Sequence, residues 1–160
     1  MSKFIEVNLE KCTACRLCEF ACSTHHFGEI NPAKSRIKVS IVSKDFFYYP
    51  NVCQQCGRAP CVDACPQEKA LVRNQQTGAI EVNTEECIGC RMCVRACPFG
   101  AMQYYDDQET AVKSDLCVER LNNEQVLAYS SVCPTGFILW GETKPIPDRL
   151  VGKPCHRISS

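Results

Sequence analysis

Apolar and polar residues alternate over several short stretches of this chain, and each stretch predicts a β-strand. Residues 5–8 and 80–83 share the sequence Ile-Glu-Val-Asn, and residues 36–42 alternate through Ile37, Val39 and Ile41. Alternation of this kind places one apolar face on a core and the other face in solvent. The strands are therefore expected to be short and half buried.

Two pairs of short apolar stretches predict hairpins. Residues 70–73 and 79–82 flank a Gln-Gln-Thr-Gly turn, and residues 101–105 and 110–113 flank Asp-Asp-Gln. Turn residues between two β-forming stretches are typical of hairpins. Helices are expected to be short, with residues 119–129 as the longest candidate. The pattern as a whole predicts an α+β fold class.

The chain contains an internal repeat with an offset of 75 residues. From Ile5 to Cys22 and from Ile80 to Cys97, 11 of 18 positions are identical, so a unit of a strand followed by a loop occurs twice. Each unit ends in four cysteines, and cysteine accounts for 15 of the 160 residues. The hydrophobic fraction of 45% includes these cysteines and falls to roughly 36% without them. A hydrophobic core built from so few apolar residues needs an additional means of stabilisation.

Twelve of the 15 cysteines form three motifs with regular spacing. Two motifs read C-x2-C-x2-C-x3-C and comprise Cys12, Cys15, Cys18 and Cys22, and Cys87, Cys90, Cys93 and Cys97. The motif between them reads C-x2-C-x4-C-x3-C and comprises Cys53, Cys56, Cys61 and Cys65. Proline follows the second and third motifs. The remaining cysteines are Cys117, Cys133 and Cys155.

The C-x2-C-x2-C-x3-C spacing followed by proline is the signature of bacterial [4Fe-4S] ferredoxins. Three cysteines at i, i+3 and i+6 on a tight loop can converge on one cubane, and the fourth cysteine ligates the other cluster of the pair. A short helix is expected to begin at this fourth cysteine, and the proline keeps regular structure from continuing past it. Two full signatures and a close variant therefore favour iron–sulfur clusters.

Two other uses of clustered cysteines fit the sequence less well. A disulfide scaffold is typical of secreted chains shorter than about 80 residues with an even number of cysteines. Structural zinc uses C-x2-C pairs separated by longer stretches, and a tetrahedral ion has no use for the third and fourth cysteine of each motif. A structural zinc-binding module is therefore only a remote alternative.

Charge and hydropathy restrict the class of partner. The 18 basic and 18 acidic residues balance, so the chain lacks the basic footprint of a nucleic-acid-binding protein. The most apolar stretch, residues 137–140, is far shorter than the roughly 18 residues of a membrane span, and the first eight residues contain no apolar signal region. We expect a cytoplasmic protein that binds no nucleic acid and has no direct membrane span.

The motifs resemble those of the four-cluster polyferredoxin subunits that accompany molybdenum or tungsten oxidoreductases, hydrogenases and carbon monoxide dehydrogenases. The resemblance covers residues 3–140 and includes the x4 gap between Cys56 and Cys61. It implies two pseudo-symmetric ferredoxin-like modules, one formed by residues 1–49 with 107–140 and the other by residues 50–106. Residues 141–160, which contain three prolines, are expected to form an extended tail that contacts a partner or is disordered.

The fourth motif of that family is incomplete in this chain. Ser114 and Tyr129 stand where the family has its first and third cysteines, whereas Cys117 and Cys133 are retained. A hydroxyl or a phenol is a harder ligand than a thiolate and matches cubane iron poorly. The cluster that would use these positions together with Cys22 is therefore expected to be lost.

The resemblance then implies three [4Fe-4S] clusters, each held by three cysteines of one motif and one cysteine of another. The expected sets are Cys12, Cys15, Cys18 and Cys133; Cys53, Cys56, Cys61 and Cys97; and Cys87, Cys90, Cys93 and Cys65. The three remaining thiols, Cys22, Cys117 and Cys155, are expected to be vestigial and buried. The alternatives are a zinc or [3Fe-4S] site completed by His25 or His156, or a redox-reactive thiol near Arg157.

The function that the resemblance implies is single-electron transfer by a subunit that is not an enzyme on its own. The short length and the degenerate fourth motif are most similar to the small electron-transfer subunits of the tungsten aldehyde oxidoreductase class, including class II benzoyl-CoA reductases. The expected partner is a large tungsten- or molybdenum-pterin catalytic subunit, with ferredoxin or another iron–sulfur subunit as the second redox partner. Arg16, Arg91 and Arg95 lie in the cluster loops, where they either raise cluster potentials or are solvated cations or partner contacts.

Overall fold

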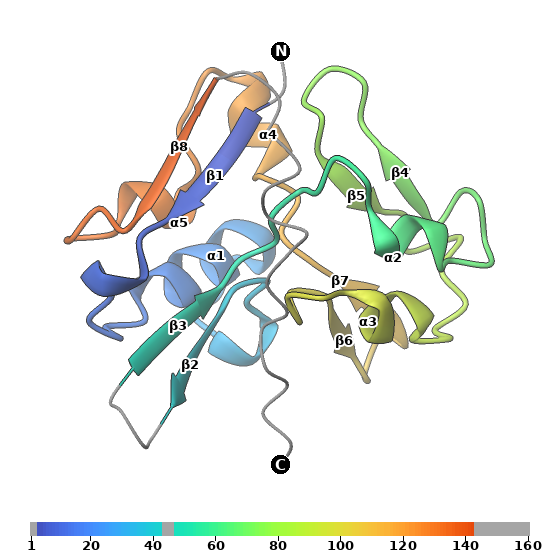
Figure 1. Ribbon diagram of the computed structural model, residues 1–160, viewed down its shortest axis with the longest axis horizontal. Helices are drawn as coiled ribbons and strands as arrows, with labels where there is room; N and C mark the ends of the chain where they lie inside the picture. Colours follow the sequence, from blue (N-terminus) through green and yellow to red (C-terminus); the bar gives the residue numbers. More distant parts are fainter. Residues whose placement is uncertain (1–2, 43–46, 143–160) are drawn as a thin grey trace.

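The computed structural model describes residues 3–42 and 47–142 (Figure 1). Within these ranges the chain forms eight strands and five α-helices. Every sheet consists of two antiparallel strands. The predicted α+β class is therefore confirmed as a small mixed fold of short hairpins and short helices.

Three hairpins join strands that follow one another in sequence. They pair β2 (Lys38–Val42) with β3 (Phe47–Asn51), β4 (Leu71–Arg73) with β5 (Ile80–Val82), and β6 (Gln103–Tyr105) with β7 (Thr110–Val112). The latter two are the hairpins that the sequence predicts. The turn between β4 and β5 is stabilised by Asn74, whose Oδ1 accepts the backbone N–H groups of Gln76 and Thr77. Gly78 completes the turn with a φ of 73°.

The fourth sheet joins the two ends of the described chain. β1 (Lys3–Val7) pairs with β8 (Ile138–Glu142) in a register that runs from Lys3 opposite Glu142 to Val7 opposite Ile138. The first two residues of the expected tail, 141 and 142, thus belong to a strand. Residues 143–160, which include Cys155 and His156, lie outside the described residues.

The helices depart from the sequence prediction in two ways. The single helix expected over residues 119–129 is two helices, α4 (Val118–Asn122) and α5 (Ala128–Ser131), because Glu124 adopts a φ of 57° that a right-handed helix cannot contain.

No helix of the described residues is long and apolar enough to cross a membrane.

The motif helices also begin earlier than predicted. They are α1 (Leu17–Phe27), α2 (Pro60–Asp63) and α3 (Met92–Ala96), and each starts immediately before the third cysteine of its motif. The predicted start at the fourth cysteine was wrong because the left-handed residues Arg16 and Arg91 already turn the chain into a helix. In the second motif, Pro60 provides the start, since its fixed φ suits the first helical position.

Two separate hydrophobic cores stabilise the chain. The first contains apolar residues from both ends of the described chain, among them Ile5, Ile37 and Phe137, and the second centres on Leu71 and Met102. In Figure 1 the corresponding lobes lie to the left, with β1, β8 and α1, and to the right, with β4, β5, α2 and α3. Both cores include cysteines, so the metal-binding motifs are part of the packing rather than appended to it: Cys18, Cys22 and Cys117 in the first, and Cys61 and Cys93 in the second.

Candidate iron–sulfur sites

The residue that precedes the second cysteine has a left-handed backbone conformation in all three complete motifs. These residues are Ala14, Gln55 and Gly89, with φ values of 54°, 48° and 67°. For a residue other than glycine this conformation costs roughly 1–2 kcal/mol. The same backbone conformation at the same position of each motif, strained at Ala14 and Gln55, indicates that each loop bends to bring the first two cysteines of the motif together.

The degenerate fourth motif keeps this backbone conformation. Leu116, which precedes Cys117, has a φ of 64°. Gly136 and Gly100 also correspond, because each lies three residues after the last cysteine of its motif, has a φ of 60° or 61°, and donates its N–H to the carbonyl of that cysteine at 3.3 Å. Residues 114–136 therefore fold as a cluster motif even though two of its cysteines are replaced.

A cavity of about 360 Å³ lies between the second and third motifs. Four cysteine side chains line it: Cys53, Cys56, Cys61 and Cys97. Its remaining wall is largely apolar and includes Ile80, Phe99 and Met102, with the single cation Lys113. These cysteines are the four that the sequence assigns to the second cluster, so the last cysteine of the third motif has crossed to its neighbour.

A second cavity, of about 320 Å³, contains the reciprocal set. The cysteines that line it are Cys65, Cys87, Cys90 and Cys93. Three come from the third motif and one from the second, again as the sequence assigns them. The apolar residues Leu71, Val82 and Ala111 complete much of the wall. Soft thiolates in an apolar setting are the donors that iron–sulfur clusters take.

The four cysteines assigned to the first cluster also lie close together. Burial raises the pKa of the Cys12 thiol, and the neighbouring Cys15 and Cys133 sulfurs raise it further. Burial and the adjacent Glu19 carboxylate raise the pKa of Cys18 to about 12, with smaller contributions from Cys12 and Cys15. Electrostatic coupling of this kind requires proximity, so the structure gathers sulfurs from the first and fourth motifs.

Burial favours the protonated form of several thiols in these motifs. Burial and neighbouring sulfurs raise the pKa of Cys93 to about 11, and the pKa values of Cys56 and Cys61 are raised for the same reasons. Cys133 differs, because hydrogen bonds from Thr135 and nearby backbone N–H groups outweigh its burial and lower its pKa. Metal binding must therefore displace protons, and iron would supply the positive charge that stabilises clustered thiolates.

The two residues that replace cysteines in the fourth motif lie in contact with each other. Tyr129 is fully buried, and its phenol oxygen lies 3.3 Å from Oγ of Ser114. Burial and the neighbouring Cys117 and Cys22 raise the pKa of this phenol well above its usual value. The two replacement residues thus satisfy each other's hydroxyl groups, and Tyr129 lies beside Cys117 and Cys22.

A buried lysine, Lys113, lines the cavity that contains Cys97, and it was not singled out from the sequence. Lys113 is only 3% exposed, and its Nζ donates to the carbonyl of Ile80 at 2.5 Å, to that of Ser114 at 2.9 Å, and to Oε1 of Gln55 at 3.2 Å. It has no ion-pair partner in the described part of the chain. Its charge lowers the otherwise raised pKa values of Cys56 and Cys61. It was missed because nothing in its sequence surroundings distinguishes it from a surface lysine.

The three arginines singled out from the sequence are exposed. Arg91 donates to Oδ1 of Asp106 at 2.7 Å, and its guanidinium lies 3.8 Å from the centre of the Tyr104 ring. An exposed, paired cation is screened by solvent and acts weakly at a distance. Arg91 lines the second cavity, but its exposure and its ion pair with Asp106 weaken its field there. The buried Lys113 is therefore the cation placed to act more strongly on a cluster.

Two of the three cysteines outside these sets, Cys22 and Cys117, are buried near each other. Cys22 is buried within α1, where its Sγ accepts the N–H of Arg36 at 3.3 Å. Cys117 is buried at the start of α4, and burial raises its pKa to about 12. His25 and His26, in the last turn of α1, lie beside Cys117. The prediction that Cys22 and Cys117 are buried is confirmed. That they are vestigial stays a prediction.

Comparisons with known proteins identify the same chemistry. Residues 44–143 match the family described as the 4Fe-4S dicluster domain. Among curated proteins, the chain is 42% identical over 114 residues to the polyferredoxin-like subunit of the aliphatic sulfonate oxidoreductase of Pyrococcus furiosus, covering 71% of this chain and 65% of that subunit. It is 32% identical over 159 residues to the electron transport protein HydN of Escherichia coli, covering 87% of each.

Other similar proteins are larger or known by structure. The putative oxidoreductase UacF of Escherichia coli is 36% identical over 138 residues, which cover 84% of this chain but only 20% of UacF. The fold resembles that of a chain in the active site complex BamBC of benzoyl coenzyme A reductase, with a TM-score of 0.53 and 23% identity over 94% of this chain and 85% of that one. At this identity the likeness concerns the fold.

Proposed function

This chain belongs to the 4Fe-4S dicluster domain family, and we propose that it carries three [4Fe-4S] clusters and relays single electrons to or from a large catalytic subunit. The observation that carries this proposal is that each of two cavities is lined by four cysteines, three from one motif and one from the other. When bound, [4Fe-4S] clusters supply reversible one-electron chemistry. The protein's part is to hold, bury and electrostatically bias them.

The proposed ligands follow from these sets. The first cluster is held by Cys12, Cys15, Cys18 and Cys133, the second by Cys53, Cys56, Cys61 and Cys97, and the third by Cys87, Cys90, Cys93 and Cys65. A fourth cluster is not expected, since Tyr129 fills the space between Ser114 and Cys117 and has no exposed surface.

The two hydrophobic cores support an arrangement in two ferredoxin-like modules, with Val52 and Ala79 of the second module packing in the first core and Ala111 of the first module in the second core. Residues 1–49 with 107–140 would form the module that retains one cluster, and residues 50–106 the module with two clusters. Gln55 would tie the modules together, because its Nε2 donates to the carbonyl of Ser114 at 2.7 Å while its Oε1 accepts the N–H of Ile80 at 2.9 Å.

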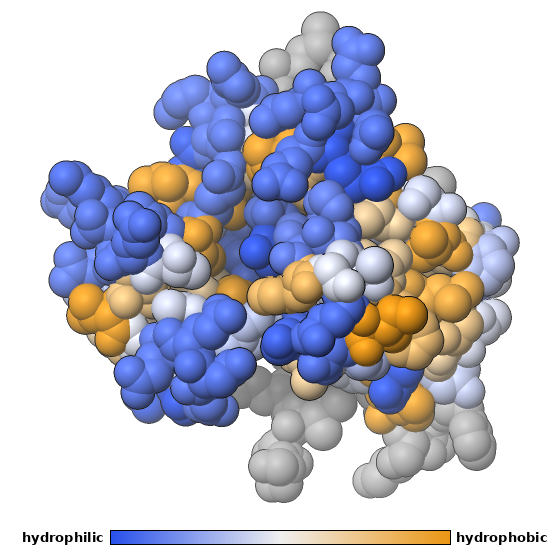
Figure 2. Space-filling view, turned by 180° about the vertical axis from the view of Figure 1, so that it is seen from behind, coloured by the Kyte–Doolittle hydropathy of each residue, from blue (hydrophilic) through white to orange (hydrophobic). Residues whose placement is uncertain are grey.

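Electrons are proposed to enter and leave where cysteines reach the surface. Cys15 of the first set and Cys90 of the third are exposed. Ile88 and Met92, which flank Cys90, are 60% and 49% exposed, and Leu17 near Cys15 is 42% exposed. Hydrophobic residues also interrupt the largely hydrophilic face in Figure 2. Apolar side chains around an exposed ligand suit a contact with a redox partner.

The partner is proposed to be a large tungsten- or molybdenum-pterin oxidoreductase subunit, with ferredoxin or another iron–sulfur subunit on the other side. Benzoyl-CoA reductase is one candidate complex, supported by the likeness to a BamBC chain. Other candidates are an aldehyde oxidoreductase, a hydrogenase or a carbon monoxide dehydrogenase, and the sulfonate oxidoreductase relative supports the broader class. The chain itself would be non-catalytic and cytoplasmic.

Anaerobic iron and sulfide analysis tests the number of clusters. Three clusters predict about 12 iron and about 12 acid-labile sulfide per chain. Values near 8 or 16 would contradict the proposal, and a colourless protein with zinc and no sulfide would establish the zinc-module alternative.

A matched pair of variants tests the ligand assignment. Cys97 and Cys22 occupy equivalent positions of the internal repeat. Cys97→Ser should remove one cluster and lower the iron content to about 8, whereas Cys22→Ser should leave about 12. The reverse pattern would refute the proposed sets. Copurification of the tagged chain from its native source, with the associated subunit identified by mass spectrometry and metal analysis, tests the partner.

A further inference from the structure

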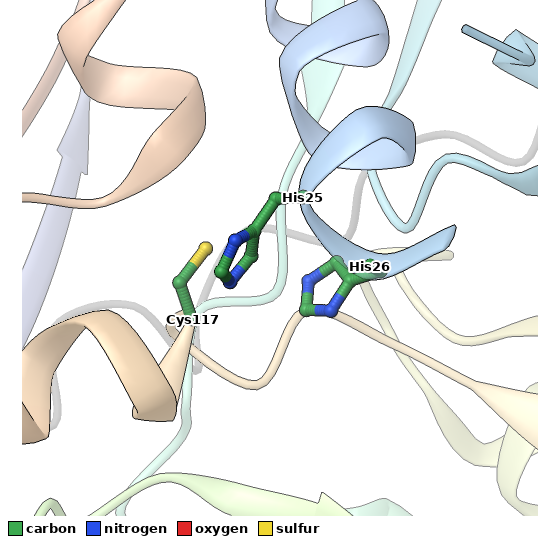
Figure 3. A group of neighbouring side chains, drawn as sticks. All are labelled: His25, His26 and Cys117. Atoms are coloured by element: carbon green, nitrogen blue, oxygen red, sulfur yellow. The ribbon is translucent and has the colours of Figure 1, made fainter. Parts of the chain in front are cut away.

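His25, His26 and Cys117 form a group of metal-ligating side chains that the proposed clusters do not use. Their donor atoms all lie within 4.8 Å of one another. Figure 3 shows both imidazoles projecting from the end of α1 and the Cys117 sulfur facing them from the start of α4. The group therefore joins two elements that are separated by some 90 residues of sequence.

The spacing of the donors is close to that of a tetrahedral metal site. Zinc–nitrogen distances of 2.0–2.1 Å and a zinc–sulfur distance of about 2.3 Å place neighbouring ligands roughly 3.3–3.6 Å apart. An upper limit of 4.8 Å is within about 1.5 Å of that geometry, which is the range of small side-chain rotations. The two imidazole rings are inclined at 62° with centroids 4.8 Å apart, so they converge without stacking.

The donor types select the kind of ion. Two imidazole nitrogens and one thiolate suit zinc and similar borderline or soft ions, whereas magnesium and calcium prefer oxygen. A [4Fe-4S] cluster would need further thiolates in place of Ser114 and Tyr129, whose oxygens are instead paired with each other. The set fits one ion with three protein ligands and an open fourth position.

The surrounding charges suit a bound cation. Asp115 lies two residues before Cys117, and its Oδ1 is 3.5 Å from Nε2 of His26 and accepts the N–H of Cys117 at 3.0 Å. Its other oxygen accepts from Nη1 of Arg36 at 2.7 Å. A carboxylate next to a metal-ligating histidine typically orients the ring and raises its basicity. Arg36 holds that carboxylate in place.

We propose that His25, His26 and Cys117 bind one mononuclear zinc-class ion that joins α1 to α4 beside the position of the missing fourth cluster. This inference goes beyond the proposed electron-transfer function, because such an ion is redox-inert as zinc. The ion would fix the end of α1 against the degenerate motif, with its fourth position open to water or an external ligand.

Element-specific spectroscopy on the intact protein tests this site. Anaerobically purified protein, grown with zinc and dialysed against a mild chelator, should retain one zinc per chain in addition to its iron. Zinc K-edge X-ray absorption should show one sulfur and two imidazole nitrogens at the distances expected for zinc. Zinc surrounded by three or four sulfurs would indicate occupancy of a cluster site and would overturn the proposal, as would zinc below a tenth of an equivalent in protein with full iron.

Variants separate a ligand role from a general effect on folding. His26→Gln and Cys117→Ser should each lower the retained zinc at least tenfold with unchanged iron and sulfide. Cys22→Ser changes an equally buried thiol outside the group and should retain the zinc. Equal zinc loss in Cys22→Ser and Cys117→Ser would refute the assigned ligands, and a sulfide content near 16 would reveal a fourth cluster instead. Iron content in each variant reports the proposed function independently.

Discussion

Replacement of the buried Lys113 by methionine should lower the reduction potential of the second cluster. Reduction adds one negative charge to the cluster, and a nearby buried cation stabilises that charge. Lys113 lines the same cavity as Cys53, Cys56, Cys61 and Cys97 and is 3% exposed. Methionine is similar in length to lysine and replaces its aliphatic stem, but it carries no charge.

The size of the shift follows from Coulomb's law. For a charge about 8 Å from the cluster centre and an effective dielectric constant of about 20, the interaction is about 2 kcal/mol. One tenfold change in a one-electron equilibrium corresponds to about 59 mV and about 1.4 kcal/mol, so the potential should fall by about 90 mV. Salt should change this value little, because screening is weak for a buried charge.

Redox titration followed by electron paramagnetic resonance measures this potential directly. Arg91→Gln is the matched control, since it also removes a cation near cluster ligands, but one that is exposed and already paired with Asp106. Arg91→Gln should change the reduction potential of the cluster nearest to it by less than about 20 mV, because exposed ion pairs contribute little energy. A shift in Lys113→Met no larger than that of Arg91→Gln, with the iron content intact, would refute the electrostatic role of Lys113.

Three further variants test other parts of the structure. Gly89→Ala places a Cβ 2.6 Å from a backbone oxygen at a φ of 67°, and it should lower the free energy of unfolding by about 2–4 kcal/mol in anaerobic denaturant titrations. The control Gly57→Ala, whose Cβ would have no atom within 4 Å, should lower it by under about 1 kcal/mol. Equal losses would contradict the steric argument. The double variant Ser114→Cys with Tyr129→Cys restores two missing ligands and should raise iron from about 12 to about 16 on reconstitution; unchanged iron would show that the site has closed. Glu19→Gln removes a buried carboxylate beside Cys18 and should raise the potential of the first cluster by tens of millivolts in the same titration, whereas a fall would oppose the predicted sign.

The parts of the structure predicted correctly from sequence are those that depend on local spacing. Both hairpins around residues 74–78 and 106–109 follow from turn residues between apolar stretches, and the cysteines that line each of the two cavities match a set that the family resemblance implies. These features depend on residues close in sequence or on a metal chemistry with strict requirements. Residue types alone specify them for that reason.

The features that sequence did not reveal depend on long-range packing. Lys113 is buried because the carbonyls of Ile80 and Ser114 and the amide of Gln55 converge on it, and Ile80 and Gln55 are far away in sequence. The break at Glu124 likewise has no glycine or proline to announce it. At Lys113 tertiary contacts outweigh the local preference of the residue, whereas local hydrogen bonds end the helix before Glu124, among them that from the N–H of Gln125 to the carbonyl of Arg120 at 2.8 Å.

The degenerate fourth motif retains the left-handed backbone conformation of the complete motifs. Leu116 still adopts a left-handed conformation at a cost of roughly 1–2 kcal/mol, although no cubane is proposed to bind there. Such strain persists where surrounding structure requires it. Here it turns the chain so that the Asp115 carboxylate accepts the N–H of Cys117 and the Cys117 sulfur meets His25 and His26. If this bend serves a metal site, Leu116→Gly should retain the zinc ion because glycine adopts the same conformation without strain, even though loss of the buried leucine side chain lowers the stability of the first core. Leu116→Pro, whose φ is fixed near −65°, should lose the ion while the two cavities lined by cysteines keep their iron.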